Sequence, residues 1–283
     1  QQQQQQQHSY HCTQSDSKTQ PSPIHTLATL VWNDDFITPA LVMWKSILRH
    51  MNASLDHFVV LVGRDVSSAA TKNLVAAGAE LVDAEPGGVR YTTRHTFADR
   101  YKASKQYMMF NKLMVFGLSP QKYGKVVYID ADVLAVADAS PLWNMQSISA
   151  VRDRGQSVTE PELNAGVFVV EPSQELFQEM VRMLNTTYRC GYRATDQSFL
   201  CSFFYGKWCE LEPRFNILAK IDSQSREPLL PPCGQNIVAR ECAVLYHFNG
   251  PKPWSTACKN SLCYGTRLKS VIQAWKALAG AEL

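Results

Sequence analysis

The chain has 283 residues, of which 45% are hydrophobic and 19% charged, so it is long enough to bury a sizeable core as a soluble globular protein. Its formal net charge is +3 and it has no block of Lys and Arg. This argues against a nucleic-acid-binding surface and leaves room for an anionic small ligand. No apolar run approaches the roughly 18 residues that are needed to cross a bilayer.

The first 23 residues differ in composition from the rest of the chain. They are rich in Gln and then in Ser, Thr, Gln and Pro, with too few apolar residues to offset the entropy of ordering. We expect residues 1–23 to form a disordered tail or stem, and residues 24–283 to form one domain. The chain begins with Gln and not with Met, so we expect a processed form, with any leader or membrane anchor outside this sequence.

Strand and helix patterns alternate along the domain. The predicted strands are residues 25–32, 57–63, 79–83 and 125–130. The predicted helices are residues 38–50, 67–78 and 105–118. Thr38 and Pro39 supply an N-cap and a first-turn proline for the first helix, and Gly78 and Gly117 lie at the ends of the other two. This alternation predicts an α/β fold with a mostly parallel sheet and helices on both faces.

Two carboxylates follow the strand "KVVYI" directly, in "DADVL". Asp130 and Asp132 are two positions apart on extended backbone, so their side chains project to the same side. Ligands of such folds bind at the carboxyl ends of the strands, and two carboxylates there suit a hard cation such as Mg²⁺ or Mn²⁺. An acid-x-acid triplet alone is more often a solvated strand end or a capped turn than a metal site, so the interpretation depends on later segments.

Three later segments contain polar residues at the ends of predicted elements. "NAGVFVVEPS" begins a strand with Asn164 and leads into a helix. "TDQSFL" places Asp196 and Gln197 at the start of a helix, where a carboxylate is also a plain N-terminal charge partner. "LYHFNGPKPW" ends a strand at His247, with a glycine and a lysine following it.

In this order, "VVYIDADVL", "NAGVFVVEPS", "TDQSFL" and "HFNGPKPW" resemble the family 8 glycosyltransferases of the glycogenin-like kind, which have a GT-A nucleotide-sugar-binding fold. "TLATLVWNDDF" is similar to the first strand and uridine-binding turn of that family. The resemblance covers roughly residues 26 to 256. It implies a Rossmann-like single domain that transfers a hexose or related sugar from a UDP-sugar to an acceptor, with retention of anomeric configuration and with Mn²⁺ or Mg²⁺ as cofactor.

The resemblance also implies a role for each matching residue. The metal on the diphosphate would be held by Asp130, Asp132 and His247. Uracil and ribose would be contacted by Val31, Asn33 and Phe36. The diphosphate or the donor sugar would be contacted by Arg100, Lys112, Ala131, Gly250 and Lys252. The catalytic residues near the anomeric carbon would be Asn164, Asp196 and Gln197. Two acids and an imidazole also suit Mn²⁺ on chemical grounds alone.

Eight cysteines suggest an oxidising compartment. Seven of them lie in the last third of the chain: Cys190, Cys201, Cys209, Cys233, Cys242, Cys258 and Cys263. We expect disulfides, and the alternative is a set of free buried thiols. The sequence does not determine the pairing, and no spacing suits a zinc site. The sequons at Asn52 and Asn185 also fit a secretory route.

The chain departs from glycogenin in ways that bear on its acceptor and location. Glycogenin glucosylates its own tyrosine before the final His strand, whereas residues 215–245 contain no Tyr here, and the "HFNGPKPW" segment is one residue shorter. We therefore expect a lumenal enzyme, in the Golgi or secreted rather than cytoplasmic, that acts on a separate glycan or glycoprotein. Any membrane association would come through an anchor outside the given chain, and we expect no nucleic-acid partner.

Other classes fit less well. A sugar-nucleotide pyrophosphorylase needs a Gly-rich basic loop after the first strand, where this chain has "WNDDF", and a dehydrogenase needs a GxGxxG motif there. A non-catalytic lumenal binding protein on a degenerate transferase scaffold remains an alternative, although it predicts lost metal ligands. The basic residues of the segment 87–100 favour an anionic donor or acceptor, which leaves a glucuronosyltransferase variant open.

Overall fold

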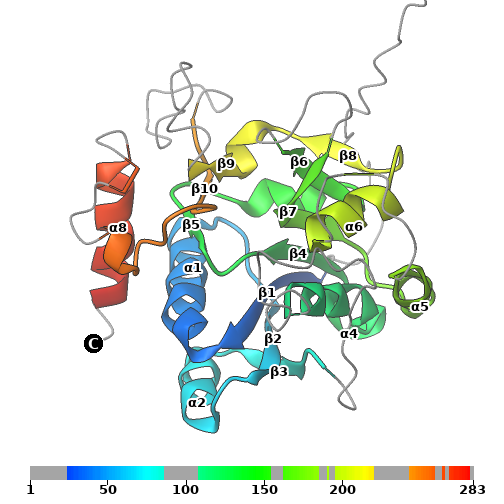
Figure 1. Cartoon of the computed structure of the whole chain (residues 1–283), viewed down its shortest axis with the longest axis horizontal. Coiled ribbons are helices and arrows are strands. Elements are labelled where there is room, and N and C mark those ends of the chain that lie inside the picture. Colours follow the sequence, from blue (N-terminus) through cyan, green and yellow to red (C-terminus); the bar gives the residue numbers. More distant parts are fainter. Residues whose placement is uncertain are drawn as a thin grey trace, which may run out of the picture.

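Two β-sheets form the centre of the molecule in the computed structural model (Figure 1). The structure describes residues 24–85, 108–153, 162–184, 190, 195–219, 242–258, 263–264 and 268–280. Within these residues the larger sheet has seven strands in the order β3-β2-β1-β4-β7-β6-β8, and the smaller sheet has the order β5-β10-β9. The predicted tail, residues 1–23, lies outside the described residues.

The strands of the larger sheet are β1 (His25–Asn33), β2 (His57–Asp65), β3 (Glu80–Asp83), β4 (Lys125–Ile129), β6 (Ser149–Arg152), β7 (Leu163–Val170) and β8 (Cys209–Leu211). Only the pairings of β7 with β4 and with β6 are antiparallel, so the sheet is mostly parallel, as predicted. The smaller sheet consists of β5 (Val133–Ala135), β9 (Ile217–Leu218) and β10 (Leu245–His247). The four strands predicted before residue 131 are confirmed.

Helices cover both faces of the larger sheet (Figure 1). The α-helices are α1 (Ile37–His50), α2 (Ser68–Ala76), α4 (Pro120–Tyr123), α5 (Gln174–Met183), α6 (Asp196–Phe203) and α8 (Lys269–Gly280). The 3₁₀ helices are Asp34–Phe36, Asn111–Gly117, Ser140–Asn144, Pro213–Phe215 and Thr256–Cys258. The predicted fold class, an α/β sheet with helices on both faces, is therefore confirmed.

Successive side chains of a strand point to opposite faces of the larger sheet, and this divides the core into two layers. Leu27 and Val31 of β1 point to the face that α1 covers, whereas Ala28 and Leu30 point to the opposite face. On the second face, Phe168 of β7 packs together with Phe110, Phe116 and Phe199, among other residues. Both faces of the central strands are apolar because both are buried, which explains the continuous apolar runs of these strands.

Two helix predictions needed correction. The first helix begins at Ile37, and its N-cap is Phe36 rather than Thr38, because a 3₁₀ turn leads directly into it. The described part of the predicted helix 105–118 is a helical turn followed by the 3₁₀ helix Asn111–Gly117, which ends at Gly117 as expected. At Gly117 a Cβ would meet the Phe177 ring at 2.9 Å, so only glycine lets α5 pack this closely.

Disulfides are present, as expected from the cysteine content. The described residues contain the pairs Cys190–Cys201 and Cys258–Cys263, and Cys242 is also disulfide-bonded. Cys209 is a free thiol. Disulfides persist mainly in oxidising compartments.

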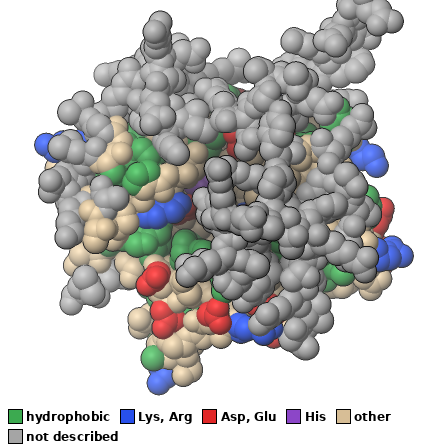
Figure 2. Space-filling view, viewed as in Figure 1, with side chains coloured by type: hydrophobic (Ala, Val, Ile, Leu, Met, Phe, Trp, Pro, Cys, Tyr) green, Lys and Arg blue, Asp and Glu red, His purple; other side chains and the backbone are tan. Residues whose placement is uncertain are grey.

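No helix among the described residues is both long enough and apolar enough to cross a bilayer. On the face in Figure 2, acidic and basic side chains are interspersed over the described part and do not gather into one patch of a single sign.

Candidate active site

A cavity of about 460 Å³ lies at the carboxyl ends of β1 and β4. Its volume is within the range of small-molecule sites. Ten of the residues predicted for the site line it: Phe36, Lys112, Asp130, Ala131, Asp132, Asn164, Asp196, Gln197, His247 and Lys252. The position agrees with the rule that ligands of open α/β sheets bind beyond the carboxyl ends of the strands.

A tight turn after β4 presents the two acids. The backbone N–H of Asp130 donates to the carbonyl of Gly166 at 2.8 Å, and that of Val133 donates to the carbonyl of Asp130 at 3.1 Å. β5 then pairs with β10 so that Val133 lies opposite His247, and the N–H of Phe248 donates to the Asp132 carbonyl at 2.9 Å. This small sheet is what brings His247 to the two acids.

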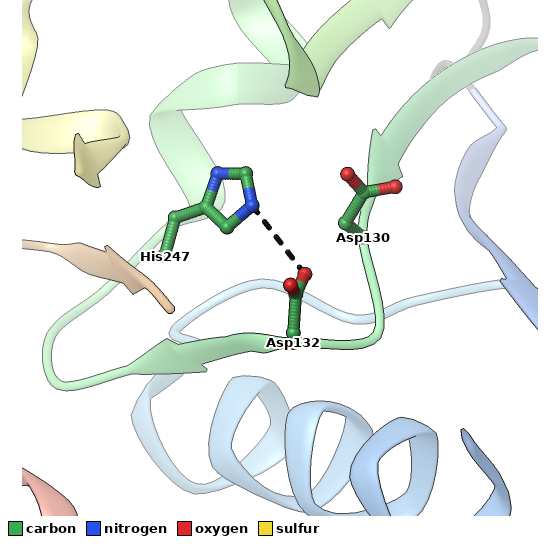
Figure 3. A group of neighbouring side chains, drawn as sticks. All are labelled: Asp130, Asp132 and His247. Carbon is green, nitrogen blue, oxygen red and sulfur yellow. Dashed lines mark ion pairs between the residues drawn. The ribbon is translucent and has the colours of Figure 1, made fainter. Parts of the chain in front are cut away.

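Asp130, Asp132 and His247 converge on one point (Figure 3). One ligand atom from each of the three side chains lies within 4.8 Å of the others, and His247 Nε2 is 3.4 Å from Asp132 Oδ1. Gly166 makes room for the imidazole, since a Cβ there would lie 2.6 Å from His247 Nδ1. Two carboxylates and an imidazole form a suitable donor set for a divalent cation. The residues present therefore fit a metal ion.

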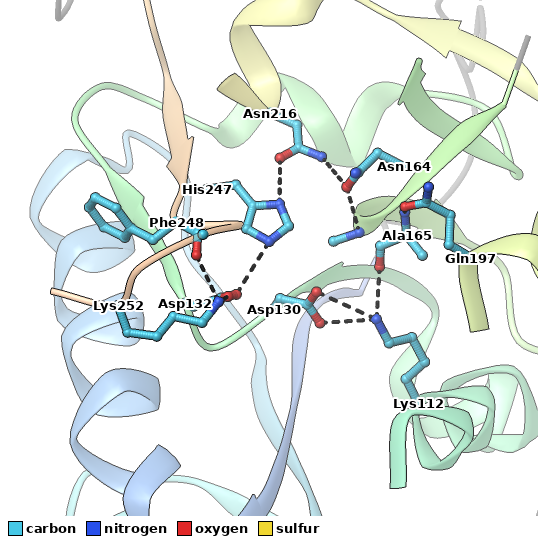
Figure 4. A network of polar contacts seen from close by, with 12 residues as sticks. Lys112, Asp130, Asp132, Asn164, Ala165, Gln197, Asn216, His247, Phe248 and Lys252 are labelled. Atoms are coloured by element: carbon cyan, nitrogen blue, oxygen red, sulfur yellow. Dashed lines mark hydrogen bonds and ion pairs between the residues drawn. The ribbon is translucent and has the colours of Figure 1, made fainter. Parts of the chain in front are cut away.

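Each acid of the cluster is also paired with a lysine (Figure 4). Lys112 Nζ lies 3.1 Å from Asp130 Oδ1 and 2.6 Å from Asp196 Oδ2, and it donates to the Ala165 carbonyl at 3.1 Å. Lys252 Nζ contacts the Asp132 carboxylate and donates to the Phe248 carbonyl at 2.7 Å. Lys112 thus holds Asp130 in place, and Lys252 holds Asp132.

Burial and the two lysines shift the pKa values in different directions. Burial alone would lower the pKa of Lys112, but the charges of Asp130 and Asp196 outweigh it and raise that pKa. For Asp130, burial raises the pKa despite Lys112. For Asp132, burial acts in the same direction, yet His247 and Lys252 outweigh it and the pKa falls. Asp132 is therefore the more firmly ionised acid of the pair.

The opposite wall consists of hydrogen-bonded amides around Asp153. Asn164 Nδ2 and Gln197 Nε2 both donate to Asp153 Oδ2, at 3.0 Å and 2.8 Å. Gln197 reaches this position because α6 begins at Asp196, with Thr195 Oγ1 as the N-cap that accepts from the Ser198 N–H at 3.2 Å. A carboxylate and two amides offer hydrogen-bond acceptors and donors for sugar hydroxyls.

Three residues that the sequence analysis did not predict belong to this site. Asp153 follows β6 at the same edge of the sheet, and an acid at the end of a strand is the signal that identified Asp130. Trp32 lines the cavity beside Phe36, with ring centroids 5.0 Å apart. Asn216 accepts a hydrogen bond from His247, and no sequence pattern marked it, since it lies between two short elements.

Four predicted residues are not in the described cavity wall. Val31 is fully buried in the core and does not line the cavity. Asn33 lies outside the wall, although its Oδ1 is buried without a hydrogen-bond partner in the described part of the chain. Gly250 donates its N–H to the Tyr264 hydroxyl at 3.2 Å. Arg100 lies outside the described residues. The roles of all four stay predictions.

The fold and the site together define a class: an α/β protein of GT-A type with an acid-acid-histidine cluster in a cavity at the carboxyl edge of the sheet. The model of the family "Glycosyl transferase family 8" matches residues 28–258. The chain belongs to this family of glycosyltransferases.

Known proteins that are similar to the chain agree with this family. Inositol phosphorylceramide glucuronosyltransferase 1 of Arabidopsis thaliana is 32% identical over 180 residues, which are 62% of this chain and 29% of that protein. Glycogenin-1 of Oryctolagus cuniculus is 27% identical over 250 residues, which are 86% of this chain and 67% of that protein. The chain thus spans less than a third of the first relative and about two thirds of the second.

Solved structures support the fold. An active-site mutant of LgtC has a TM-score of 0.63 at 19% identity, with 90% of this chain and 95% of that chain covered. The galactosyltransferase LgtC in complex with donor and acceptor sugar analogues has a TM-score of 0.60 at 18% identity, with the same coverage. At this level of identity the likeness shows the GT-A fold and nothing finer.

Proposed function

We propose that this protein is a metal-dependent, retaining glycosyltransferase that moves a hexose or related sugar from a UDP-sugar to a glycan or glycoprotein acceptor. One observation carries the proposal: Asp130, Asp132 and His247 converge within 4.8 Å in the same cavity as the amides of Asn164 and Gln197. A cation site and a wall suited to sugar hydroxyls therefore adjoin each other, as a sugar diphosphate requires.

The metal site would hold Mn²⁺ or Mg²⁺ through Asp130, Asp132 and His247. Such an ion, when bound, neutralises charge on a departing diphosphate. Lys252 lies next to Asp132, and its ammonium group is a point charge for the β-phosphate. Phe36 and Trp32 provide aromatic surface in the cavity wall, where uracil and ribose would lie.

The sugar subsite would be formed by Asn164, Gln197 and Asp153. Their amide donors and carboxylate acceptor are fixed by hydrogen bonds before any ligand enters, which lowers the cost of orienting a sugar. Asp196 lies in the same wall but is ion-paired to the buried Lys112. We therefore assign Asp196 to holding Lys112 and the start of α6, and Gln197 to contact with the sugar near its anomeric carbon.

The relatives and the cysteine chemistry bear on the donor sugar and the acceptor. Glycogenin-1 and a plant glucuronosyltransferase are both similar to this chain, so a glucuronic acid donor is the specific alternative to a neutral hexose. The disulfides and the sequons favour a lumenal enzyme of the secretory pathway, in the Golgi or secreted, with an acceptor other than itself.

A non-catalytic lumenal binding protein on a degenerate scaffold is the second candidate function. It accounts for the fold equally well, because fold does not imply function. It does not account for the intact cluster, since a binding protein has no need to keep three convergent metal ligands and Lys252.

The decisive experiment is UDP release from a panel of UDP-sugars with and without Mn²⁺, using purified protein and an Asp132→Asn control. Metal-dependent release from one donor, lost in the control while its thermal transition is kept, would support the proposal and identify the sugar. No release from any donor, together with no UDP binding, would support the degenerate scaffold instead.

A further inference from the structure

A chain of hydrogen-bonded side chains runs from His247 through Asn216 to Asn164 (Figure 4), and Asn164 continues it to Asp153. His247 Nδ1 lies 3.1 Å from Asn216 Oδ1, and Asn216 Nδ2 donates to Asn164 Oδ1 at 2.8 Å. Asn164 Nδ2 in turn donates to Asp153 Oδ2 at 3.0 Å. Asn216 is only 2% exposed, so water does not replace these contacts.

We propose that Asn216 is a positioning residue that fixes His247 in the Nδ1–H tautomer and leaves the lone pair of Nε2 pointing at the two acids. The purpose of this arrangement rests on the proposed function, because it prepares His247 for a metal. The tautomer itself is a property of the free protein and can be observed without one.

The direction of the hydrogen bonds is set by the backbone. Asn164 Oδ1 accepts from the N–H of Gly166 at 2.9 Å, and a backbone N–H is a donor in every state of the protein. The Asp153 carboxylate, which accepts hydrogen bonds, fixes the other end of the same amide through Asn164 Nδ2. If the Asn164 amide were reversed, its NH₂ group would face the N–H of Gly166, and its oxygen would face the carboxylate of Asp153. Neither pair can form a hydrogen bond.

The orientation of the Asn164 amide determines the orientation of the Asn216 amide, which in turn determines which nitrogen of His247 carries the proton. Because Asn164 presents its oxygen, Asn216 must present its Nδ2 there, and its Oδ1 then faces the imidazole. An oxygen acceptor at that place requires a proton on His247 Nδ1. In the neutral ring Nε2 is then unprotonated, and this is the nitrogen that lies 3.4 Å from Asp132 Oδ1.

The ring is also held in place sterically. Gly166 packs against it so closely that a Cβ would lie 2.6 Å from His247 Nδ1. β9 keeps Asn216 beside the ring, because Leu218 pairs with His247 in the small sheet. Partners of this kind on the second nitrogen of a metal-binding histidine set its tautomer and strengthen metal binding.

Two variants of Asn216 separate its roles. Asn216→Asp keeps an acceptor for His247 Nδ1 but loses the donor to Asn164, whereas Asn216→Ala loses both. The matched control is Asn111→Ala, which removes another fully buried amide, one that donates to Glu85 Oε1 at 2.9 Å. The tautomer of His247 is read from long-range ¹H–¹⁵N NMR spectra of the metal-free protein. Mn²⁺ affinity is measured by titration in the presence of UDP.

We expect an unprotonated Nε2 on His247 in the wild type, in Asn216→Asp and in Asn111→Ala, and a mixture of tautomers in Asn216→Ala. Mn²⁺ affinity should fall about 10- to 100-fold in Asn216→Ala and stay near the wild-type value in the other two. A wild-type ring protonated on Nε2 would overturn the inference, as would wild-type spectra and Mn²⁺ affinity in Asn216→Ala. If Asn216→Ala does not fold, the spectra of the wild type and of Asn216→Asp still show whether Asn216 fixes the tautomer of His247.

The two proposals fail in different ways. If the wild type binds neither Mn²⁺ nor UDP, the proposed function fails, and the NMR spectrum still shows whether Asn216 fixes the tautomer. If the wild type binds both but His247 carries its proton on Nε2, the function stands and the role of Asn216 is wrong.

Discussion

Replacing Lys112 by Met tests how the charges of the site are held. The Lys112 side chain is 6% exposed and lies 2.6 Å from Asp196 Oδ2 and 3.1 Å from Asp130 Oδ1. Methionine keeps the apolar stem and removes the ammonium group. The change leaves two buried carboxylates near each other without the cation between them, although the Tyr128 hydroxyl still donates to Asp130 Oδ1 at 2.8 Å.

The expected cost follows from the burial of the pair. Removing one partner of a buried ion pair costs about 3–5 kcal/mol, because the remaining charge is uncompensated. For a domain of this size 1 kcal/mol corresponds to roughly 2–4 °C in Tm, so Lys112→Met should lower Tm by roughly 6–20 °C. The matched control is Arg152→Met, whose partner Glu210 lies 2.9 Å away on the surface, and which should cost less than about 1 kcal/mol.

Urea and thermal unfolding followed by circular dichroism would measure both variants. Asp196→Asn and the double variant complete a mutant cycle, and we expect a coupling energy of about 0.5–3 kcal/mol between Lys112 and Asp196. Equal stability losses in Lys112→Met and Arg152→Met, or strict additivity in the cycle, would show that Lys112 does not hold the two carboxylates.

Three further predictions concern the metal site, a remote helix and a disulfide. Gly166→Ala should displace His247 and lower Mn²⁺ affinity on the order of 10- to 100-fold in a titration, and an unchanged affinity would contradict the fit of the ring against Gly166. Ser173→Ala removes the N-cap of α5 and should lower the free energy of unfolding in urea by about 0.5–2 kcal/mol. The Mn²⁺ affinity should not change, and a changed affinity would contradict the placement of α5 away from the site. Replacing both Cys190 and Cys201 by Ala should cost about 2–4 kcal/mol by the same assay, and non-reducing intact mass should show the loss of one disulfide.

Much of the fold was predictable because its strands are buried on both faces. The apolar runs before Asn33, Asp65 and Asp130 are short and rich in β-branched residues, which favours buried strands, and their alternation with helices indicated a parallel sheet. The segment around Lys112 was harder, because apolar residues on nearly all sides satisfy an α-helix and a 3₁₀ helix alike. Packing of Gly117 against Phe177, which is a tertiary contact, accompanies the tighter form.

The site was predictable where residues lie in short motifs and not where they meet only in space. Asp130, Asp132 and His247 were found from the motifs that contain them, and the small sheet brings them together. Asn216 has no motif of its own, and its importance depends on the pairing of β9 with β10. The ion pair between Lys112 and Asp196 likewise joins residues far apart in sequence, so the expected role of Asp196 did not include it.

The charges of the cavity wall favour a bound cation. The described wall contains four aspartates and two lysines, so with neutral His247 its formal charge is −2. An anionic diphosphate would be repelled by such a wall, whereas a divalent cation cancels that charge. The two lysines do not replace the cation, because Lys112 and Lys252 already pair with Asp130 and Asp132. They keep both acids in position, and His247 Nε2 completes the set of ligand atoms on the side that faces the cavity. The net charge of the wall therefore favours a divalent cation beside an anionic ligand, and the two lysines fix the positions of the acids that would hold it.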